Sequence, residues 1–174
     1  VEGGGYGGRG LGSGGKGSTC SVGGNKPEGY GDYYAWGEIK TKSEYTSDNS
    51  ITYDMRFKFN DISGDARYDA ARANWGGTWR LPTYTELEEL TYKCTWTWTT
   101  QNSISGYKVT GPNGNSIFLP AEGYVPPSRK EAVETDSGFY LSDSDDHQIL
   151  YFKEDMYGNS ARKYKGKYSV RMVF

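Results

Sequence analysis

The chain has 174 residues, which is the size of one domain, and 34% of them are hydrophobic. Its formal net charge is −2, so no overall positive charge favours binding to nucleic acid or to an anionic membrane. No apolar run in the sequence approaches the roughly 18 residues of a membrane-spanning helix.

Aromatic residues make up 16% of the chain, with 16 tyrosines and 5 tryptophans. Tyr and Trp give a large contact area at low conformational-entropy cost, so this composition is typical of recognition surfaces. A second interpretation is structural: Trp and Tyr replace Leu and Ile in a loop-rich core. We favour the structural interpretation for the tryptophans and leave both open for the tyrosines.

The N-terminal segment, Val1–Gly31, holds more than half of the 25 glycines. Its composition alone predicts a flexible tail. Gly in ordered irregular chain instead marks tight turns, so we expect this segment to be part of the fold or to lead into a domain over residues 32–174. Because the chain begins without Met or a signal-like stretch, we expect a mature or trimmed product.

The next segments are mixed. Ser18–Val22 has some strand character, and Asp32–Ile39 predicts a strand or a tight aromatic loop. Thr41–Ser63 is polar and predicts a long surface loop, inside which alternating apolar residues over 53–59 indicate a short strand.

Two short helices are predicted in the middle of the chain. Asp65–Ala73 is rich in Ala, Arg and Asp and predicts the first helix, which Gly76 ends. Thr83 is a good N-cap for the second helix, Tyr84–Lys93, and Glu86 completes a capping box.

The elbow between the helices is extended and flanked by tryptophans. Pro82 disfavours the helical region for Leu81, so Trp79–Leu81 predicts a short extended crossing. On the second helix, Leu87 and Leu90 are three residues apart on one face, which therefore needs a sheet to pack on.

Strands follow the helices. They are predicted at Cys94–Thr100, Gly106–Thr110, Ser116–Leu119, Gly138–Ser142, Gln148–Lys153 and Tyr168–Val173. Gly111–Asn115 is a strong turn signal that makes a hairpin of the second and third strands. Polar loops are predicted at Asp143–His147 and Glu154–Gly166. Central helices with antiparallel strands around them predict an α+β domain, with a small twisted sheet closed by the terminal strands.

Eight residues are predicted to be buried: Trp75, Trp79, Leu81, Leu87, Leu90, Phe118, Leu150 and Val170. Arg80 and Arg171 follow core-facing residues, and a buried arginine must be paired, for which Glu38 and Glu122 are the candidates. Cys20 and Cys94 are the only cysteines; they could form a disulfide, as in an exported protein, or be two buried thiols.

Several segments together resemble one family. They are Cys20–Gly23, Pro27–Glu38, Ala70–Leu90 with its Trp-Gly-Gly-Thr-Trp-Arg-Leu-Pro-Thr motif, Cys94–Trp98, Gly106–Gly111, Ile117–Tyr124 and Ser169–Val173. In this order they are similar to the Fibrobacter major paralogous domain and related Bacteroidetes surface proteins, over roughly Leu11 to Phe174.

This resemblance implies a C-type lectin-like fold, in the branch that also holds formylglycine-generating enzymes. The same fold is used by the variable proteins of diversity-generating retroelements, whose C-terminal segment displays the ligand-binding residues. It therefore implies two short helices packed on a small twisted antiparallel sheet, with recognition near the C-terminus.

Catalytic and metal sites are poorly supported by the sequence. His147 is the only histidine, which excludes multi-histidine metal sites and leaves a histidine-based triad without support, and the two cysteines do not match the formylglycine-generating active site. No cofactor is predicted; Asp143, Asp145 and Asp146 could bind calcium, but without a regular calcium-loop spacing. We therefore predict that the chain is not an enzyme.

The predicted function is binding through C-terminal loops on a rigid scaffold. Rigid aromatics are mixed there with adaptable polar groups, as in binding paratopes. The predicted ligand face consists of Tyr140, Ser142, Ser144, Asp145, His147, Tyr151, Lys153, Asp155, Tyr157, Asn159, Arg162 and Tyr164. The alternative for this set is a group of ordinary solvated loops.

The predicted partner is a protein or glycan on another cell or particle, with no nucleic acid, and the predicted location is extracellular, on the cell surface or on a virion. The basic aromatic run over 162–168 could contact phosphates or bases, but it is short and the chain is acidic overall. The alternative function is a structural tip or decoration subunit of a pilus or phage particle, assembled through Val1–Gly31. An enzyme related to formylglycine generation is the least favoured class.

Overall fold

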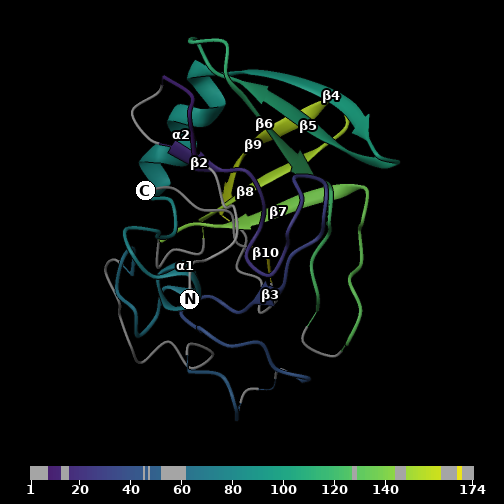
Figure 1. Cartoon of the computed structure of the whole chain (residues 1–174). Coiled ribbons are helices and arrows are strands. Elements are labelled where there is room, and N and C mark those ends of the chain that lie inside the picture. The colour runs from purple at the N-terminus through teal and green to yellow at the C-terminus, as the bar shows by residue number, and fades with distance from the viewer. Residues whose placement is uncertain are drawn as a thin grey trace.

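The computed structural model describes residues 8–12, 16–44, 46, 48–51, 62–126, 129–143, 148–161 and 168–169. These residues form mixed α+β structure, with two short helices and three small sheets (Figure 1). The predicted α+β class is confirmed at this level. The predicted strand over 53–59 and Val170 lie outside the described residues.

The largest sheet has five strands in the order β3-β10-β7-β8-β9. Their bounds are β3 Tyr33–Tyr34, β7 Ser137–Leu141, β8 Gln148–Lys153, β9 Met156–Ala161 and β10 Tyr168–Ser169. β10 pairs antiparallel with β3, so segments from the two ends of the chain meet in this sheet as expected. It pairs parallel with β7, however, so the sheet that was predicted to be antiparallel is mixed at this position.

A three-stranded antiparallel sheet lies above β7 and β8 in the view of Figure 1. It consists of β4 Thr95–Gln101, β5 Ile104–Thr110 and β6 Ser116–Pro120. The predicted hairpin between the second and third of these strands is confirmed. A small ribbon of β1 Gly8–Gly10 and β2 Lys16–Ser18 precedes the other elements.

The five-stranded sheet is covered on both faces, because alternate residues of β7 and β8 enter two different cores. Phe139, Leu141 and Ile149 pack with Ala70 and Ala71 of helix α1 (Ala70–Trp75); we call this cluster the α1 core. The strands between two covered faces are therefore almost continuously apolar, as in buried sheets.

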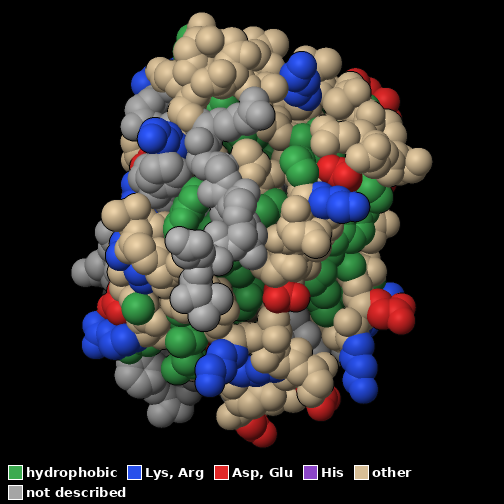
Figure 2. Space-filling view, viewed as in Figure 1, with side chains coloured by type: hydrophobic (Ala, Val, Ile, Leu, Met, Phe, Trp, Pro, Cys, Tyr) green, Lys and Arg blue, Asp and Glu red, His purple; other side chains and the backbone are tan. Residues whose placement is uncertain are grey.

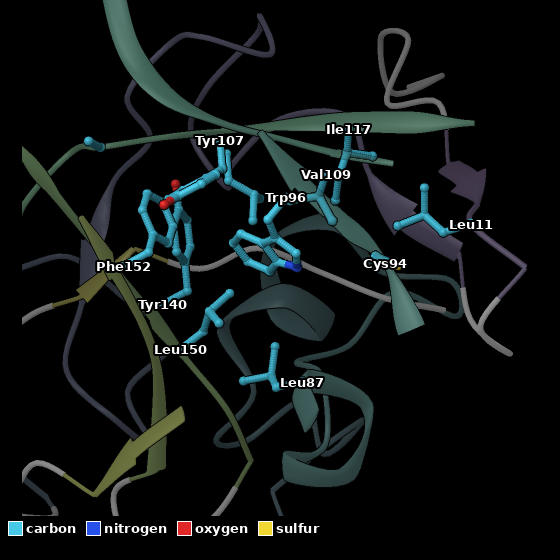
Figure 3. Close-up of a cluster of buried hydrophobic side chains, with 12 residues drawn as sticks. Leu11, Leu87, Cys94, Trp96, Tyr107, Val109, Ile117, Tyr140, Leu150 and Phe152 are labelled. Carbon is cyan, nitrogen blue, oxygen red and sulfur yellow. The ribbon is translucent and has the colours of Figure 1, made fainter. Parts of the chain in front are cut away.

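The opposite face forms the α2 core. There Tyr140, Leu150 and Phe152 pack with Leu87 of helix α2 (Tyr84–Lys93) and with Trp96 of β4. Figure 3 shows the Trp96 indole lying between the side chains of β5 and β6 and those of β7 and β8. The two helices thus lie on opposite faces of one sheet.

The helix predictions differ in outcome. α2 spans Tyr84–Lys93 as predicted, and both hydrogen bonds of the capping box between Thr83 and Glu86 are present. The first helix begins at Ala70 rather than Asp65, because the buried Asp69 side chain caps it by accepting from the Ala71 and Arg72 N–H groups. It ends at Trp75, and the C-cap residue Gly76 has a φ of 67°, which favours glycine.

The predicted loop over Glu154–Gly166 is wrong in its first half. Residues 156–161 form β9, which pairs antiparallel with β8. The sequence Met-Tyr-Gly-Asn-Ser-Ala has no apolar alternation, so its strand conformation comes from pairing with β8 rather than from its own pattern.

The predicted buried residues are partly confirmed. Leu81, Leu87, Phe118 and Leu150 are buried. Trp75, Trp79 and Leu90 are half-buried at the margins of the two cores. Trp75 and Trp79 meet edge to face with ring centroids 5.1 Å apart, so the two tryptophans that flank the elbow pack on each other.

Arg80 is half-buried and paired, but with neither predicted carboxylate. Its Nη1 and Nη2 donate to the two carboxylate oxygens of Glu86 at 2.9 and 2.6 Å. Burial raises the pKa of Glu86, but the hydrogen bonds from Arg80 and Thr83 outweigh burial, and the pKa lies below its ordinary value. Arg171 lies outside the described residues.

Glu38 and Glu122, the two carboxylates that the sequence predicted as partners of Arg80, make other contacts. Glu38 pairs with Lys42 at 2.5 Å. Glu122 is fully buried, and its carboxylate accepts from the Ser21 hydroxyl and the Gly31 N–H, both at 3.0 Å. Glu122 therefore fastens the glycine-rich segment to the chain that follows β6.

Cys20 and Cys94 are both buried and are not joined by a disulfide in the structure, in keeping with the second of the two alternatives.

Candidate functional site

The tip of the β8–β9 hairpin is the most prominent exposed feature among the predicted site residues. Lys153 pairs with Met156, which leaves Glu154 and Asp155 as a two-residue turn. All residues from Lys153 to Tyr157 are exposed. Asp155 has a φ of 66°, in the left-handed region that Asp tolerates better than most residues.

A buried hydroxyl holds this turn from below. Tyr107 of β5 donates its hydroxyl to the Lys153 carbonyl at 3.2 Å, which ties the hairpin to the three-stranded sheet. Burial raises the pKa of Tyr107, and the negative charge of Asp155 raises it further. The neutral hydroxyl that makes this bond is therefore stable over the whole physiological pH range.

Tyr157 is exposed and is nevertheless fixed in orientation. Its ring stacks on Trp96 with a centroid distance of 4.6 Å and an interplanar angle of 5°. Tyr107 meets it edge to face at 5.6 Å, while 42% of the Tyr157 surface remains exposed. Trp96 is itself fixed, because its Nε1 donates to the Leu90 carbonyl at 3.0 Å. The Tyr157 ring would therefore lose little conformational freedom when a ligand stacks on it.

The other face of the hairpin has an open position beside a second tyrosine. Tyr151 is half-buried and packs on Phe139 with ring centroids 5.0 Å apart. It pairs across the strands with Gly158, where an added Cβ would have no atom within 4 Å. The position at Gly158, across the strands from Tyr151, is therefore open.

The structure divides the predicted ligand face. Strand alternation places Tyr151 and Lys153 on the α1-core face and Tyr157 and Asn159 on the α2-core face, with Asp155 in the turn. Asn159 is half-buried, and its Oδ1 has no hydrogen-bond partner within the described part of the chain.

Two of the predicted residues lie in the interior. Tyr140 is 1% exposed and donates its hydroxyl to the Pro120 carbonyl at 2.8 Å. Ser142 is fully buried, and its carbonyl accepts from Trp36 Nε1 at 3.1 Å. The remaining predicted residues, Ser144, Asp145, His147, Arg162 and Tyr164, lie outside the described ranges.

Sequence reasoning missed the residues that support the tip. Trp96 and Tyr107 belong to other strands, and no local pattern connects them to Tyr157. The Glu154–Asp155 pair was the one available signal, since a two-residue polar turn after a strand predicts a hairpin rather than a loop.

The buried carboxylates have structural roles. The Asp143 Oδ1 accepts from the Tyr84 N–H at 3.0 Å, at the start of α2, so its side chain is used within the fold. Across the described ranges, no group of three or more His, Cys, Asp or Glu residues is arranged to hold a metal ion. Asp145 and Asp146, the other members of the calcium hypothesis, fall outside those ranges.

Charge on the surface is mixed. On the face shown in Figure 2, Lys and Arg side chains are interspersed with Asp and Glu. Neither of the two described helices has the length and apolar character needed to cross a membrane.

Comparison with known proteins gave no match to a family model, to a curated protein or to a solved structure.

Proposed function

We infer that this chain is a ligand-binding domain that holds a protein or glycan reversibly through the β8–β9 tip and the C-terminal segment around it. The observation that carries the proposal is the stacking of the exposed Tyr157 ring on the buried Trp96. An exposed aromatic is a good contact surface, and one that is already fixed loses little entropy on binding.

The finer part of the proposal concerns the scaffold and its display. The order of sequence motifs supports a C-type lectin-like scaffold, and the pairing of β3 with β10 is in keeping with it. By the same resemblance, the domain acts outside the cell, on a cell or virion surface, as a receptor or adhesin. A nearby reverse transcriptase gene with a near-copy of the C-terminal coding segment would establish it as a diversified variable protein.

The N-terminal segment bears on the structural-subunit alternative. Asn113 and Asn115 donate to the Gly10 carbonyl at 2.7 and 2.9 Å, and Glu122 binds Ser21 and Gly31. These contacts use the glycine-rich segment within its own domain, which favours the binding module over assembly through that segment.

A binding screen with a matched pair of variants tests the proposal. The full chain would be screened on glycan arrays and on displayed protein libraries, and each hit retested with Tyr157→Ala. We expect Tyr157→Ala to weaken binding about tenfold or more, as for a central aromatic contact. Combining it with Tyr151→Ala and Tyr164→Ala should abolish binding.

Tyr92→Ala is the control, since Tyr92 on α2 is a tyrosine with 83% of its surface exposed and lies outside the proposed site. The ligands found in the screen should bind Tyr92→Ala as tightly as they bind the wild-type chain. Thermal melting would verify that each variant is folded at the assay temperature. Hits that bind the folded triple variant undiminished would exclude the tip as the ligand site.

A further inference from the structure

β9 is the last strand of the five-stranded sheet. In the part of the chain that the structure describes, no strand pairs with its outer edge. Alternate N–H and C=O groups of such an edge point away from the sheet and can pair with another extended chain.

The sequence of β9 does not protect this edge. Native edge strands are commonly blocked by Pro, by Lys or by an inward-pointing charge. Met156–Ala161 contains none of these residues. β4 is likewise at the edge of its sheet and has a similar uncharged composition, so it provides an internal comparison.

The residues on the two faces of β9 favour particular side chains in a strand that would pair with its outer edge. A residue that pairs with Gly158 would lie on the same face as Tyr151, in the open space beside that ring. The next residue of the incoming strand would lie on the opposite face, beside the exposed Tyr157 ring. The Gly158 position thus suits a large side chain.

Charge at the tip favours a basic residue next to Tyr157. Glu154 and Asp155 are both exposed there, against one positive charge on Lys153. A guanidinium can stack on a tyrosine ring and pair with a nearby carboxylate at the same time. An arginine beside Tyr157 therefore matches both the ring and the charge of the turn.

We propose that the β9 edge binds an extended peptide of a partner protein as an additional antiparallel strand, with an aromatic residue opposite Gly158 and an arginine opposite Tyr157. This inference rests on the proposed function, because it specifies the ligand class for the same hairpin. The antiparallel direction is chosen because such pairs are slightly more stable per residue than parallel ones. Main-chain pairing supplies affinity, and the two side-chain positions supply specificity.

The probe is the capped peptide acetyl-Ser-Thr-Thr-Phe-Arg-Thr-amide, whose Phe falls opposite Gly158 and whose Arg falls opposite Tyr157. It would be titrated into the ¹⁵N-labelled full chain, with amide hydrogen exchange as a second measurement. We expect chemical-shift changes along β9 and slower exchange of those β9 amides that do not pair with β8. The β4 amides should be unaffected.

Three controls separate strand pairing from other contacts. The same peptide with N-methyl groups on alternate amides should not bind, because the main-chain pairing is blocked. A peptide with Phe and Arg exchanged should bind about fivefold more weakly, as expected for loss of two cross-strand contacts. Gly158→Val should weaken the probe about tenfold by filling the space beside Tyr151, and a probe with Ala in place of Phe should bind this variant as well as the wild-type chain.

The opposite results overturn the proposal. The first three are unchanged hydrogen exchange of the β9 amides, equal binding of the N-methylated peptide, and protection of β4 instead of β9. The fourth is protection of β9 that depends on protein concentration in the absence of peptide, which would mean that a second copy of the chain occupies the edge. If screening hits depend on Tyr157 while the probe leaves β9 unprotected, the proposed function stands and strand addition is wrong. If the probe protects β9 while the hits ignore Tyr157, strand addition stands and the proposed ligand site is wrong.

Discussion

Asp69 accepts four backbone hydrogen bonds from three parts of the elbow region. Its Oδ2 accepts from the Gly64 and Leu81 N–H groups at 2.6 and 2.9 Å, and its Oδ1 accepts from Ala71 and Arg72 at 2.8 and 3.1 Å. The side chain is fully buried, so none of these donors could turn to water without a rearrangement. A single carboxylate thus joins the loop before α1, the helix start and the extended crossing.

Replacing this carboxylate by an amide tests its role. Asp69→Asn keeps one acceptor oxygen and places an NH₂ group against two N–H donors, so we expect a loss of about 2 kcal/mol or more in the free energy of unfolding. Asp65→Asn, the same change at a half-buried carboxylate that pairs with the exposed Arg67, should have a much smaller effect, because an ion pair at the surface contributes little. Urea denaturation measures both, and equal effects of the two changes would contradict this assignment.

At the residue scale, the sequence identified Tyr151, Lys153, Asp155 and Tyr157 as accessible positions, and the structure leaves each of them at least partly exposed. It could not separate them from Tyr140 and Ser142, which are buried. Exposure of alternate residues in β7 depends on whether each face of the sheet is covered. Here α1 and α2 cover opposite faces, and no local pattern in β7 carries that information.

At the scale of the element, the bounds of α2 were predicted correctly. Its start could be predicted because the start signal is contained within four residues. The capping box of Thr83 and Glu86 is local chemistry, and it forms as the sequence indicates. The boundary of α1 was wrong because its cap, Asp69, is selected by tertiary hydrogen bonds to Gly64 and Leu81. β9 was missed for the same kind of reason, since its partner β8 determines its conformation.

Glu86 also makes the stability of the α2 start dependent on pH. Its pKa is lowered in the folded protein, so the stabilisation is present above the ordinary Glu pKa and is lost as pH falls through the lowered value. Glu86→Gln keeps an oxygen acceptor for the cap but removes the charge that pairs with Arg80. Between about pH 7 and pH 3, this variant should therefore lose less unfolding free energy than the wild-type chain.

Glu89→Gln is the matched control for this experiment. Glu89 pairs with Lys93 on the solvent side of the same helix, where a surface ion pair contributes little. Urea denaturation at several pH values should give this control a pH dependence close to that of the wild-type chain. If Glu86→Gln follows the wild-type curve as well, the Arg80–Glu86 pair does not couple to protonation as described.

At the scale of the whole molecule, the two cores share the strands β7 and β8. Leu141 packs in the α1 core and Leu150 in the α2 core, on neighbouring strands of one sheet. The cores therefore cannot separate without breaking the same backbone pairing, and we expect them to unfold as one cooperative unit.

Two leucine truncations test this coupling. Leu141→Ala and Leu150→Ala should each cost about 2–5 kcal/mol, as for a buried leucine, and each should shift one single thermal transition. Fluorescence follows the tryptophans, and far-ultraviolet circular dichroism follows the backbone. Two resolved transitions, or different midpoints from the two signals, would show that the cores are independent.

The Tyr107 hydroxyl has a consequence for the register in which β8 pairs with its neighbouring strands. β8 is apolar on both faces. If β8 slid by one residue along β7, Ile149 and Tyr151 would move to the α2-core face and Leu150 and Phe152 to the α1-core face, and apolar side chains would still be buried on both faces. Burial alone therefore discriminates poorly between the native register and its neighbour. The two-residue turn and the bond from Tyr107 to the Lys153 carbonyl are compatible with one register only. A single polar contact beneath the hairpin thus contributes uniqueness to the fold, even where its contribution to the energy is small.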